Sequence, residues 1–596
     1  MRSSGIVPRV RILAPFLFLA ALILISVLLD RPLPRADIVY ANTSENFTLD
    51  PQRLSYQHDV RTSRSLFEGL VNVNGENGTA EPAVATSWQR SEDGRTWTFH
   101  LRTDARWSSG APVTSHDFMY AWRRAMLPDL AADYTGFFLS IDGAKEFFDW
   151  RTKALAVFSK TDGGAEAAQK LWQETESRFA TQVGLSAPDD HTLVVRLARP
   201  VAYWLDLCAF PALFPVYPPL VEKFATINPR TATLQQDPGW TKGGVLISNG
   251  PYELVQWRPK RSMRFEKNPY YWDAANVSSK TIQSIPIEDP NTAVLAFENG
   301  DIDWLTDTIV EYRGDMFDEV KRGKRTNLHV LDAFGTDFFS FNCRPKLSDG
   351  RVNPFANPAV RRAFALSVDK ATIVNSITRL DEDVATTFTP PNSIPGYQTP
   401  AGLPFDPARA RAELASAGWK DRDNDGLLEN ENGEKFPTVE IMYSAGSPRY
   451  RDMAGALSAM WLETLGIQSA PRSRDPLGYK DALKQGDFMI ARGGWYGDYG
   501  DPTTWLDLCR TGDGNNDRKY SCAEFDALLD NASNEIDPAR RFQILQDAER
   551  IITERDLPMI PICHYVTVYM YDPARLNGLS HHPRLEQYLG HMRMKN

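Results

Sequence analysis

The chain lacks the signals on which nucleic-acid-binding proteins and many enzymes depend. Its 596 residues contain 66 lysines and arginines against 76 aspartates and glutamates, a formal net charge of −10 at pH 7. Binding to nucleic acid requires a basic surface that neutralises phosphates, so no nucleic-acid partner is predicted. The sequence also contains no glycine-rich phosphate loop ending in Lys-Ser or Lys-Thr, no His-Glu-x-x-His pair and no nucleophile elbow. We therefore predict no enzymatic activity, no catalytic residue and no cofactor.

Two weaker patterns of catalytic or metal-binding type remain. The segment SVDK, from Ser367 to Lys370, matches the Ser-x-x-Lys pattern of penicillin-interacting enzymes. It lies inside a predicted amphipathic helix, and the chain has no Lys-Thr-Gly segment to complete such a site. His581 and His582, with His591, could hold a metal, but adjacent residues on a strand face opposite ways. We expect these histidines to lie on the surface.

The segment DRDNDGLLENEN, residues 421–432, begins like a calcium-binding loop. Asp421, Asp423 and Asp425 occupy the first, third and fifth positions, and Gly426 follows at the sixth. The twelfth position holds Asn432, where a bidentate glutamate is expected. The alternative is a polar Asp-Gly turn that leads into a hairpin. We favour that alternative, so no metal site is predicted.

Long apolar runs are also scarce, and the clearest one lies near the N-terminus. Residues 12–29 are almost wholly apolar and follow Arg2, Arg9 and Arg11. As a helix this run would span roughly 27 Å, close to the thickness of a bilayer core. No small-x-small cleavage site and no lipid-accepting cysteine follow it, so we favour a retained membrane anchor over a cleaved signal peptide. The arginines place the N-terminus in the cytoplasm and everything after about Arg31 in the periplasm or another extracytoplasmic space.

Cysteine is rare, and the five cysteines cannot all pair with one another in an exported protein. Cys509 and Cys522 flank a polar, glycine-containing loop that is short enough to close easily. Cys208 and Cys563 lie in apolar segments, where a buried free thiol is the simplest interpretation. The sequence leaves the state of Cys343 open.

The chain is rich in alternating secondary structure. At 67.1 kDa it is too long for a single core, so two or three domains are expected. The sequence predicts a strand over residues 38–41, a hairpin that turns at Pro259 and Lys260, and a helix between its cap Asp406 and Gly418. Strands and helices alternate in this way without a long linker or an internal repeat. The predicted fold class is α/β with interleaved domains.

One stretch towards the C-terminal end concentrates recognition chemistry. IARGGWYGDYGDPTTW, residues 490–505, places an arginine, aromatic residues and aspartates among four glycines. One interpretation is an aromatic-rich structural turn. The other is a glycine-flanked strand whose backbone is open to an extended ligand, with Asp498 receiving an ammonium group and Arg492 pairing with a carboxylate through its planar fork. A ligand with an amine, a carboxylate and a peptide backbone is a peptide.

From about residue 38 onwards, the chain resembles the periplasmic oligopeptide- and dipeptide-binding proteins, the extracytoplasmic solute receptors of ABC transporters. Each supporting segment is modest evidence by itself, but seven of them occur in the family's order. The segments are TLDP, LFEGLV, PAVATSWQRSEDGRTWTFHLRTDARWSSGAPVTSHDFMYAWRR, SNGPYELVQW with KNPYYW, NPFANPAVRRAFALSVDK, DPARARAELASAGW and GGWYGDYGDPTTW.

This resemblance implies a bilobed α/β periplasmic-binding-protein fold of type II, similar to cluster C, with a hinge, an extra inserted domain and an N-terminal transmembrane helix. The implied division is an anchor in residues 1–34, lobe I in residues 35–65, 191–286 and 562–596, inserted domain II in residues 66–190, and lobe II in residues 287–561. Members of the family clamp an extended peptide between the lobes. The resemblance therefore implies a monomeric substrate-binding component that delivers peptides to ABC permease and ATPase subunits.

The same resemblance assigns the peptide-binding residues. Asp498 occupies the position that pairs with the ligand's α-amino group, and Arg492 the position that engages the carboxylate in some peptide receptors. The residues expected to line the two walls are Gly494, Trp495 and Tyr496 beside the peptide backbone, and Ser55, Tyr56 and Gln57 opposite them. The spacing of Cys509 and Cys522 resembles a disulfide of the dipeptide receptors, which predicts that these cysteines are bonded.

Departures from the family pattern leave the cargo open. Ser55 stands where oligopeptide receptors often carry an acidic residue, and the basic and aromatic residues expected within DPLGYKDALKQGD are not recognisable. Peptide length and the carboxylate contact are therefore undefined. Murein peptides, haem or a nickel chelate are alternative cargoes for the same fold, and an exported hydrolase is the alternative from a different class. A retained anchor is also unusual beside the cleaved or lipidated forms of the family.

Overall fold

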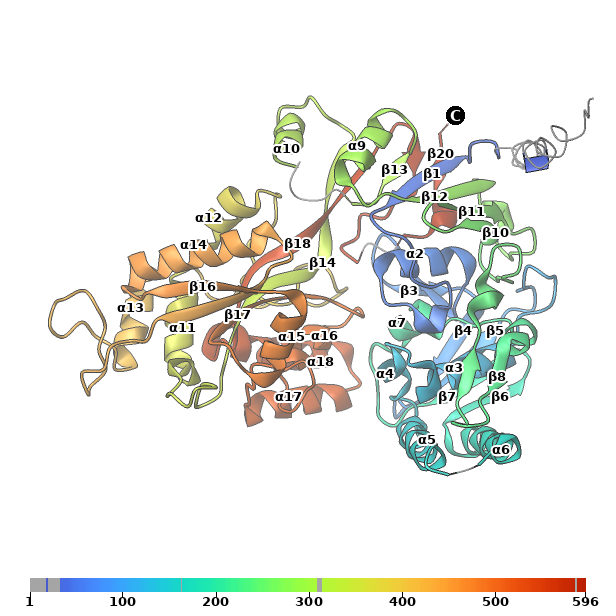
Figure 1. The fold of residues 1–596 in the computed structure, drawn as a ribbon, viewed down its shortest axis with the longest axis horizontal. Coiled ribbons are helices and arrows are strands. Elements are labelled where there is room, and N and C mark those ends of the chain that lie inside the picture. Colours follow the sequence, from blue (N-terminus) through green and yellow to red (C-terminus); the bar gives the residue numbers. More distant parts are fainter. Residues whose placement is uncertain (1–17, 20–32, 162, 308–312, 585–586, 596) are drawn as a thin grey trace, which may run out of the picture.

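The computed structural model describes residues 18–19, 33–161, 163–307, 313–584 and 587–595. This part of the chain forms two lobes that lie side by side (Figure 1). The predicted anchor, residues 12–29, lies outside the described residues except for Phe18 and Leu19. Over the described ranges, no helix combines the length and the apolarity needed to cross a membrane.

A ten-stranded sheet runs through both lobes, in the order β10-β11-β12-β1-β13-β18-β14-β17-β15-β16. Its strands are β1 (Ile38–Asn42), β10 (Tyr252–Arg258), β11 (Ser262–Lys267), β12 (Thr281–Pro286), β13 (Trp304–Leu305), β14 (Leu328–Phe341), β15 (Val439–Ser444), β16 (Ser469–Arg474), β17 (Ile490–Tyr496) and β18 (Met559–Tyr571). Lobe I, at the right of Figure 1, contains β1 and β10 to β13, and lobe II, at the left, contains β15 to β17. β14 and β18 run from one lobe to the other.

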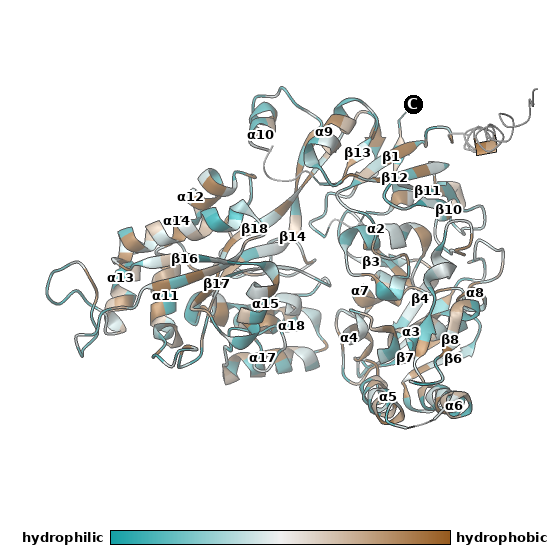
Figure 2. Cartoon of the chain, in the orientation of Figure 1, coloured by the Kyte–Doolittle hydropathy of each residue, from teal (hydrophilic) through white to brown (hydrophobic). Residues whose placement is uncertain are grey.

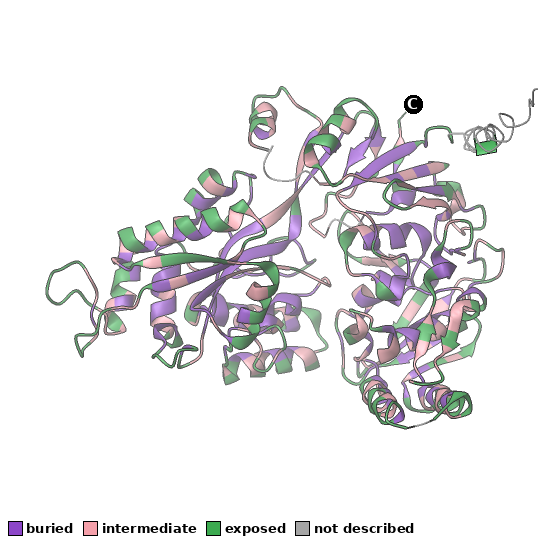
Figure 3. Ribbon diagram, in the orientation of Figure 1, coloured by how far each residue is buried: buried purple, intermediate pink, exposed green. Residues whose placement is uncertain are grey.

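These two connecting strands are long and mostly buried. β14 has 14 residues and β18 has 13, and most of their side chains are inaccessible to solvent (Figure 3). They pair antiparallel, with register shifts between Asp332 and Thr336 and between Asp337 and Phe338. A shift of this kind bends a strand and increases its twist. The first shift lies where the part of β14 that pairs with β17 begins, and the second lies within that part.

The inserted domain has its own four-stranded sheet, in the order β4-β5-β7-β6. Its elements are β4 (Ala85–Arg90), β5 (Thr96–Leu101), α3 (Ser115–Ala125), α5 (Ala144–Phe158), α6 (Ala165–Gln182), β6 (Leu185–Asp189) and β7 (Thr192–Arg196). β7 pairs with both β5 and β6. The inserted sheet therefore extends to Arg196, beyond the boundary predicted at residue 190.

The inserted domain and lobe I share one hydrophobic core. A continuous cluster of buried side chains includes Ile38 of β1, Phe99 of β5 and Trp122 of α3. Close to this cluster, Arg124 of α3 forms a buried ion pair with Asp50, which lies between β1 and the inserted sheet in the sequence. Because apolar burial is the dominant favourable term in folding, the insertion and lobe I pack as one body.

Helices cover both faces of the sheet in lobe II. Consecutive residues of a strand point to opposite faces, and Phe338 and Phe339 of β14 accordingly belong to different cores. Phe339 packs with α11 (Pro358–Leu366), α13 (Pro407–Ser416) and α14 (Pro448–Leu465), whereas Phe338 packs with α17 (Ala523–Asn534) and α18 (Pro538–Arg550). These helices carry both apolar and polar residues, as amphipathic surface helices do (Figure 2).

Local signals in the sequence account for several element boundaries. Asp406 caps α13 by accepting a hydrogen bond from the backbone N–H of Arg409 at 2.9 Å, with proline at the first helical position. The predicted strand over residues 38–41 is β1, and the hairpin that turns at Pro259 and Lys260 is formed by β10 and β11. These three predictions are confirmed.

The Ser-x-x-Lys segment does not lie inside one helix as predicted. Ser367 is the C-cap of α11, and Lys370 begins α12 (Lys370–Thr372). The Ser367 hydroxyl donates to the carbonyl of Phe364 at 2.9 Å, and the Lys370 ammonium donates to the carbonyl of Ala385 at 2.9 Å. Since each side chain is bonded to the backbone, the two do not form a nucleophile and base pair.

Candidate functional site

A cavity of about 530 Å³ lies between the two lobes. One wall comes from lobe I, from the start of α2 (Gln57–Leu66) and the residues before it. The other walls come from the middle of β14, from the end of β17 and from β18. The volume is within the range of about 300–1,000 Å³ that is typical of sites for small ligands.

Five of the eight predicted peptide-binding residues line this cavity. They are Ser55, Tyr56, Gln57, Tyr496 and Asp498. The first three lie at the N-terminal end of α2 and the last two at the end of β17. The structure therefore brings the two predicted walls together.

Asp498 follows β17 in a turn that backbone contacts define. Its N–H donates to the hydroxyl of Thr504 at 3.1 Å, and the N–H of Gly497 donates to the carbonyl of Phe334 at 2.7 Å. Position 497 requires glycine, because a Cβ there would lie 2.3 Å from the ring of Phe334 and 2.8 Å from the ring of Trp505. The close approach of β14 thus fixes where Asp498 emerges into the cavity.

The carboxylate of Asp498 has no compensating charge nearby. Within the part of the chain that the structure describes, no side chain forms an ion pair with it or a hydrogen bond to it. Burial raises its pKa from 3.8 to about 6, and burial is the only cause of the shift. An incoming cation would restore the interactions that this carboxylate lost on leaving water.

The opposite wall is aromatic and polar. The ring of Tyr56 stacks on His58, with centroids 5.5 Å apart and planes at 4°. Burial and the nearby guanidinium of Arg61 lower the pKa of His58 to about 4, so this imidazole is neutral at pH 7. Ser55 donates a hydrogen bond to the carboxylate of Asp133, which gives this wall an acidic neighbour at the cavity rim.

Both signs of charge line the cavity. Its charged residues, apart from the neutral His58, are Arg61, Arg64, Arg584, Asp307 and Asp498. Arg61 donates to the side-chain carbonyl of Asn42 at 2.6 Å, and its guanidinium carbon lies 5.1 Å from the ring centroid of Trp304. The Nε of Arg61 is buried without a hydrogen-bond partner. A zwitterionic ligand would find partners for both of its ends.

β17 presents an unpaired edge next to this cavity. On one side it pairs with β14 along its whole length, from Ile490 to Tyr496. On the other side β15 pairs only with Ile490 and Ala491. Among the described strands, the rest of β17 has no partner on that side. The carbonyl of Arg492 on that side accepts a hydrogen bond from the hydroxyl of Tyr479. The backbone groups beyond Arg492 are therefore available to an extended chain that adds as a strand.

The side chains of β17 face different surroundings. Trp495 points into the core of lobe II, and its indole N–H donates to the hydroxyl of Thr504 at 3.3 Å. Tyr496 lines the cavity and stacks on Tyr565, with centroids 4.8 Å apart. Gly494 lies against the hydroxyl of Tyr565, only 2.0 Å from where a Cβ would be. Gly494 and Trp495 do not line the cavity, and only their backbone is placed to meet a ligand.

The sequence suggested that Arg492 engages a ligand carboxylate. In the structure, Arg492 pairs instead with Asp337. Its Nε and one terminal nitrogen donate to the two carboxylate oxygens of Asp337, at 3.0 and 2.8 Å. It also donates to the hydroxyl of Tyr565 at 2.6 Å and packs on the ring of Tyr450, 3.7 Å from the ring centroid. Arg492 does not line the cavity. Because Asp337 occupies the planar fork, the predicted carboxylate contact is not supported.

Asp337 is a residue that the sequence analysis missed. It is fully buried on β14, opposite Gly494 in the β14–β17 register, and it also pairs with Arg449 of α14 at 3.2 Å. Arg449 in turn pairs with Glu382 at 2.9 Å, so two guanidiniums and two carboxylates balance in the interior. The available signal was a single acidic residue within the apolar segment AFGTDFFSF.

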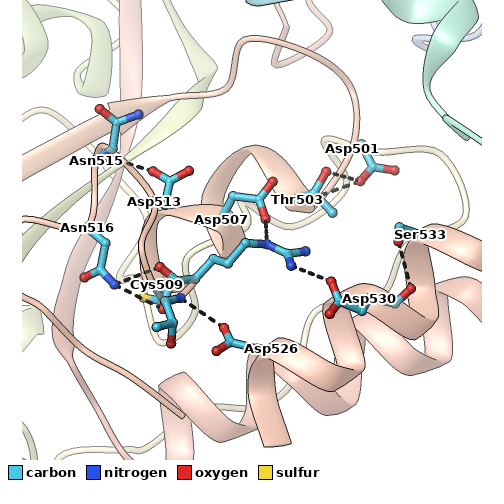
Figure 4. A network of polar contacts seen from close by, with 12 residues as sticks. Asp501, Thr503, Asp507, Cys509, Asp513, Asn515, Asn516, Asp526, Asp530 and Ser533 are labelled. Carbon is cyan, nitrogen blue, oxygen red and sulfur yellow. Dashed lines mark hydrogen bonds and ion pairs between the residues drawn. The ribbon is translucent and has the colours of Figure 1, made fainter. Parts of the chain in front are cut away.

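The loop between Cys509 and Cys522 is closed by hydrogen bonds rather than by a disulfide (Figure 4). All five cysteines are free, so the predicted bond is absent from the structure. Cys509 is buried in the core, whereas Cys522 is the N-cap of α17. The side-chain amide of Asn516 donates to the carbonyls of Arg510 at 2.9 Å and Tyr520 at 2.8 Å, which holds the loop closed.

The second aspartate of the recognition stretch has a structural role. Asp501 accepts two hydrogen bonds from the guanidinium of Arg541, at 2.5 and 3.0 Å, and both side chains are buried. The hydroxyl of Thr503 also donates to Asp501 at 2.7 Å (Figure 4). Such a satisfied bidentate pair anchors the turn that carries Asp498.

Direct contacts join the lobes beside the cavity. The rings of Tyr203, in the segment before α7 (Trp204–Cys208), and Tyr499, after β17, are stacked with centroids 4.2 Å apart and planes at 8°. The N–H of Gly500 donates to the carboxylate of Asp206 at 2.5 Å, and Asp206 also pairs with Arg584. These contacts hold the segment around Asp498 close to lobe I.

Comparisons with known proteins agree with this architecture. Residues 79–517 match the family model of bacterial extracellular solute-binding proteins, family 5. The chain is 28% identical over 543 residues to the periplasmic oligopeptide-binding protein OppA of Escherichia coli, covering 90% of this chain and 88% of that protein. Its structure is similar to the unliganded open form of the murein tripeptide-binding protein MppA, with a TM-score of 0.75, 26% identity and coverage of 94% of this chain and 98% of that one.

A further similar structure contains a peptide. Haemophilus influenzae OppA in complex with RPPGFSPFR has a TM-score of 0.67 and 26% identity, and the match covers 94% of this chain and 99% of that one. The family model spans well over half of the chain, and the relatives cover nearly all of it. The chain therefore belongs to the bacterial extracellular solute-binding proteins of family 5.

Proposed function

We propose that this protein captures extended peptides between its lobes and delivers them to the permease and ATPase subunits of an ABC transporter. The observation that carries the proposal is the carboxylate of Asp498, which lies in the interlobe cavity with its pKa raised to about 6 and no cation of the described chain beside it. A peptide's α-ammonium group supplies the missing partner. The names of OppA and MppA support a peptide cargo.

The peptide backbone adds to the free edge of β17. Strand addition gives affinity through main-chain hydrogen bonds and is largely independent of the ligand's side chains. The open edge begins after Arg492, whose carbonyl accepts a hydrogen bond from Tyr479, and ends at Tyr496, two residues before Asp498. A peptide whose amino group reaches Asp498 therefore lies with its first residues beside this edge.

The peptide carboxylate is assigned to the basic residues of the cavity wall rather than to Arg492. Arg492 is held by Asp337, as described above. Arg61 lines the cavity and has an Nε without a partner. Arg61 is therefore the residue that we assign to the carboxylate end.

We also propose that β14 and β18 form the hinge between the lobes, at their register shifts. In this division, lobe I with its insertion comprises residues 35–286 and the C-terminal segment, and lobe II comprises the intervening residues. The proposed location is extracytoplasmic, with residues 12–29 retained as an anchor. The intact mass of the mature protein distinguishes retention from cleavage.

The proposal is tested by replacing Asp498 with asparagine. Removing one partner of a buried, hydrogen-bonded charge pair typically costs about 2–5 kcal/mol. Asp498→Asn should therefore weaken binding of a free-amine peptide by roughly 30-fold or more, as measured by titration calorimetry. The exposed Asp481 on α15 (Pro476–Gln485) offers a matched control, since Asp481→Asn removes the same charge from a residue that does not line the cavity.

N-acetylated peptides make the test specific. They should bind the wild type weakly and lose little more on Asp498→Asn, because the ammonium partner is already absent. Equal losses for free and acetylated peptides would show that Asp498 is structural. C-terminally amidated peptides give the corresponding comparison for Arg61→Gln. Recovery of intact peptide after binding separates a receptor from a hydrolase, which would release fragments.

A further inference from the structure

A group of acidic side chains at the far end of lobe II takes no part in the cleft. It lies in the loop between α13 and β15, at the left edge of Figure 1. We propose that this loop binds a calcium ion through the carboxylates of Asp421, Asp423 and Glu429. This site is separate from the peptide cavity and does not depend on the proposed transport function.

The three carboxylates already satisfy the distance condition for a shared ion. One oxygen from each of Asp421, Asp423 and Glu429 lies within 4.8 Å of the others. Ca²⁺ binds oxygen ligands at about 2.3–2.6 Å, so two oxygens on the same ion are at most about 5 Å apart. Over the residues that the structure describes, no other trio of His, Cys, Asp or Glu side chains meets this condition.

Glu429 provides a second, independent observation that points to a cation site. Glu429 is only 5% exposed, whereas Asp421 and Asp423 lie at the surface. Its Oε2 accepts a hydrogen bond from the backbone N–H of Arg422 at 3.0 Å, but its Oε1 is buried without a partner. Burying an unpartnered carboxylate oxygen is costly. A cation between Glu429 and the two aspartates would remove that cost.

The backbone of the loop is shaped around the same point. Gly426, the sixth residue counted from Asp421, has φ +84° and donates its N–H to the Asp421 carboxylate at 3.2 Å. The chain then returns, and Glu429 pairs with Lys420 in an antiparallel bridge. Glu429 thus reaches the site from the ninth position of the loop. This explains how the loop can bind calcium although Asn432 occupies the twelfth position.

Of the basic side chains of the loop, Arg422 is directed away from the three carboxylates. The guanidinium of Arg422 donates to the carbonyls of Gly418 at 3.3 Å and Asn430 at 3.1 Å. Lys435 pairs with Asp425 at 2.6 Å, and its ammonium also interacts electrostatically with Asp423 and Glu429, so a bound ion would compete with it for these two carboxylates. The donors are all oxygens on an exposed, irregular loop. Such a set suits Ca²⁺ better than Zn²⁺, which prefers nitrogen and sulfur, or Mg²⁺, which requires near-ideal octahedral geometry.

A bound ion would stabilise the packing of Trp419 and Phe436 against the core of lobe II. Trp419 and Phe436 flank the loop, with ring centroids 4.6 Å apart and planes at 65°. Both rings, together with Leu428 inside the loop, pack against the core that contains α13 and α14. Bound calcium would hold the two ends of the loop together and so stabilise this lobe.

Terbium luminescence tests the proposal directly. The full-length protein, stripped with a chelator, is titrated with Tb³⁺ while tryptophan is excited, since Trp419 lies two residues from Asp421. We expect one saturable site from which Ca²⁺ displaces Tb³⁺, with a Ca²⁺ dissociation constant of about 10⁻⁴–10⁻³ M, as in other extracellular modules. Ca²⁺ should also raise the thermal midpoint of the protein.

Three variants locate the site. Glu429→Gln and Asp423→Asn should each weaken Ca²⁺ binding at least tenfold. Because Asp423 is exposed, we expect Asp423→Asn to fold normally. Glu431→Gln removes the same charge from an exposed residue of the same loop and should change affinity less than twofold. Absence of saturable binding, or equal weakening by Glu431→Gln, would overturn the proposal. Peptide affinity should be unchanged in all three variants. A negative result for the calcium site would therefore leave the proposed peptide site unaffected, and the reverse also holds.

Discussion

At the scale of the residue, the proposed role of Asp498 predicts that peptide binding depends on pH. Its pKa in the ligand-free protein is about 6, and only its ionised form attracts an ammonium group. Affinity for a free-amine peptide should therefore be highest near pH 7 and fall as the pH drops below 6, approaching tenfold per unit. It should also decline towards pH 8, because the peptide's own amine loses its proton at a pKa of about 7.7–8.0. His58 has a pKa of about 4 and titrates below this range.

Calorimetry between pH 5 and pH 8 checks this prediction. The raised pKa means that the folded, empty protein binds this proton more tightly than the unfolded chain does. The stability that protonation contributes is present at low pH and is lost as the pH rises through 6. Asp498→Asn should abolish the fall in affinity below pH 6. If the variant kept the same slope, another group would be responsible.

At the scale of the element, Asp337 holds three elements together, since it pairs with Arg492 of β17 and Arg449 of α14 from its own place on β14. Breaking a buried ion pair by removing one partner typically costs about 3–5 kcal/mol. We expect Asp337→Asn to lower the free energy of unfolding by that amount in urea denaturation. The double variant Asp337→Leu/Arg492→Met removes both charges and should lose less. A loss below about 1 kcal/mol for Asp337→Asn would contradict this account.

The same elements show what the sequence could predict. The start of α13 follows from Asp406 and the proline after it, because capping is a local interaction. Asp498 could be assigned to the candidate site because the glycine-rich stretch carries its own signal, whereas Tyr496 was assigned only through the resemblance to the family. The pairing of Arg492 with Asp337 could not, because it joins residues 155 positions apart and depends on how β14 registers against β17. The closure of the cysteine-flanked loop by Asn516 likewise depends on side-chain geometry that spacing does not reveal.

At the scale of the whole molecule, the contact between Tyr203 and Tyr499 should bias the lobes towards each other. A stacked aromatic pair is worth about 0.5–1.5 kcal/mol beyond its burial, which corresponds to a shift of roughly 2- to 10-fold between closed and open forms. Tyr203→Ala should increase the radius of gyration of the ligand-free protein in small-angle X-ray scattering. Tyr203→Phe keeps the ring and should not. Identical radii for Tyr203→Ala and the wild type would show that the stack does not control closure.

The central place of β18 has a consequence for secretion. β18 lies between β13 and β14, although it comes from the last part of the chain. When the polypeptide is exported with its N-terminus first, β13 and β14 therefore cannot be joined through β18 until the C-terminal part of the chain has crossed the membrane. Until then the edges of β13 and β14 are open to other chains, and exposed strand edges promote aggregation. We therefore expect export of this protein to depend on chaperones in the receiving compartment, because the central strand of its sheet is the last to form.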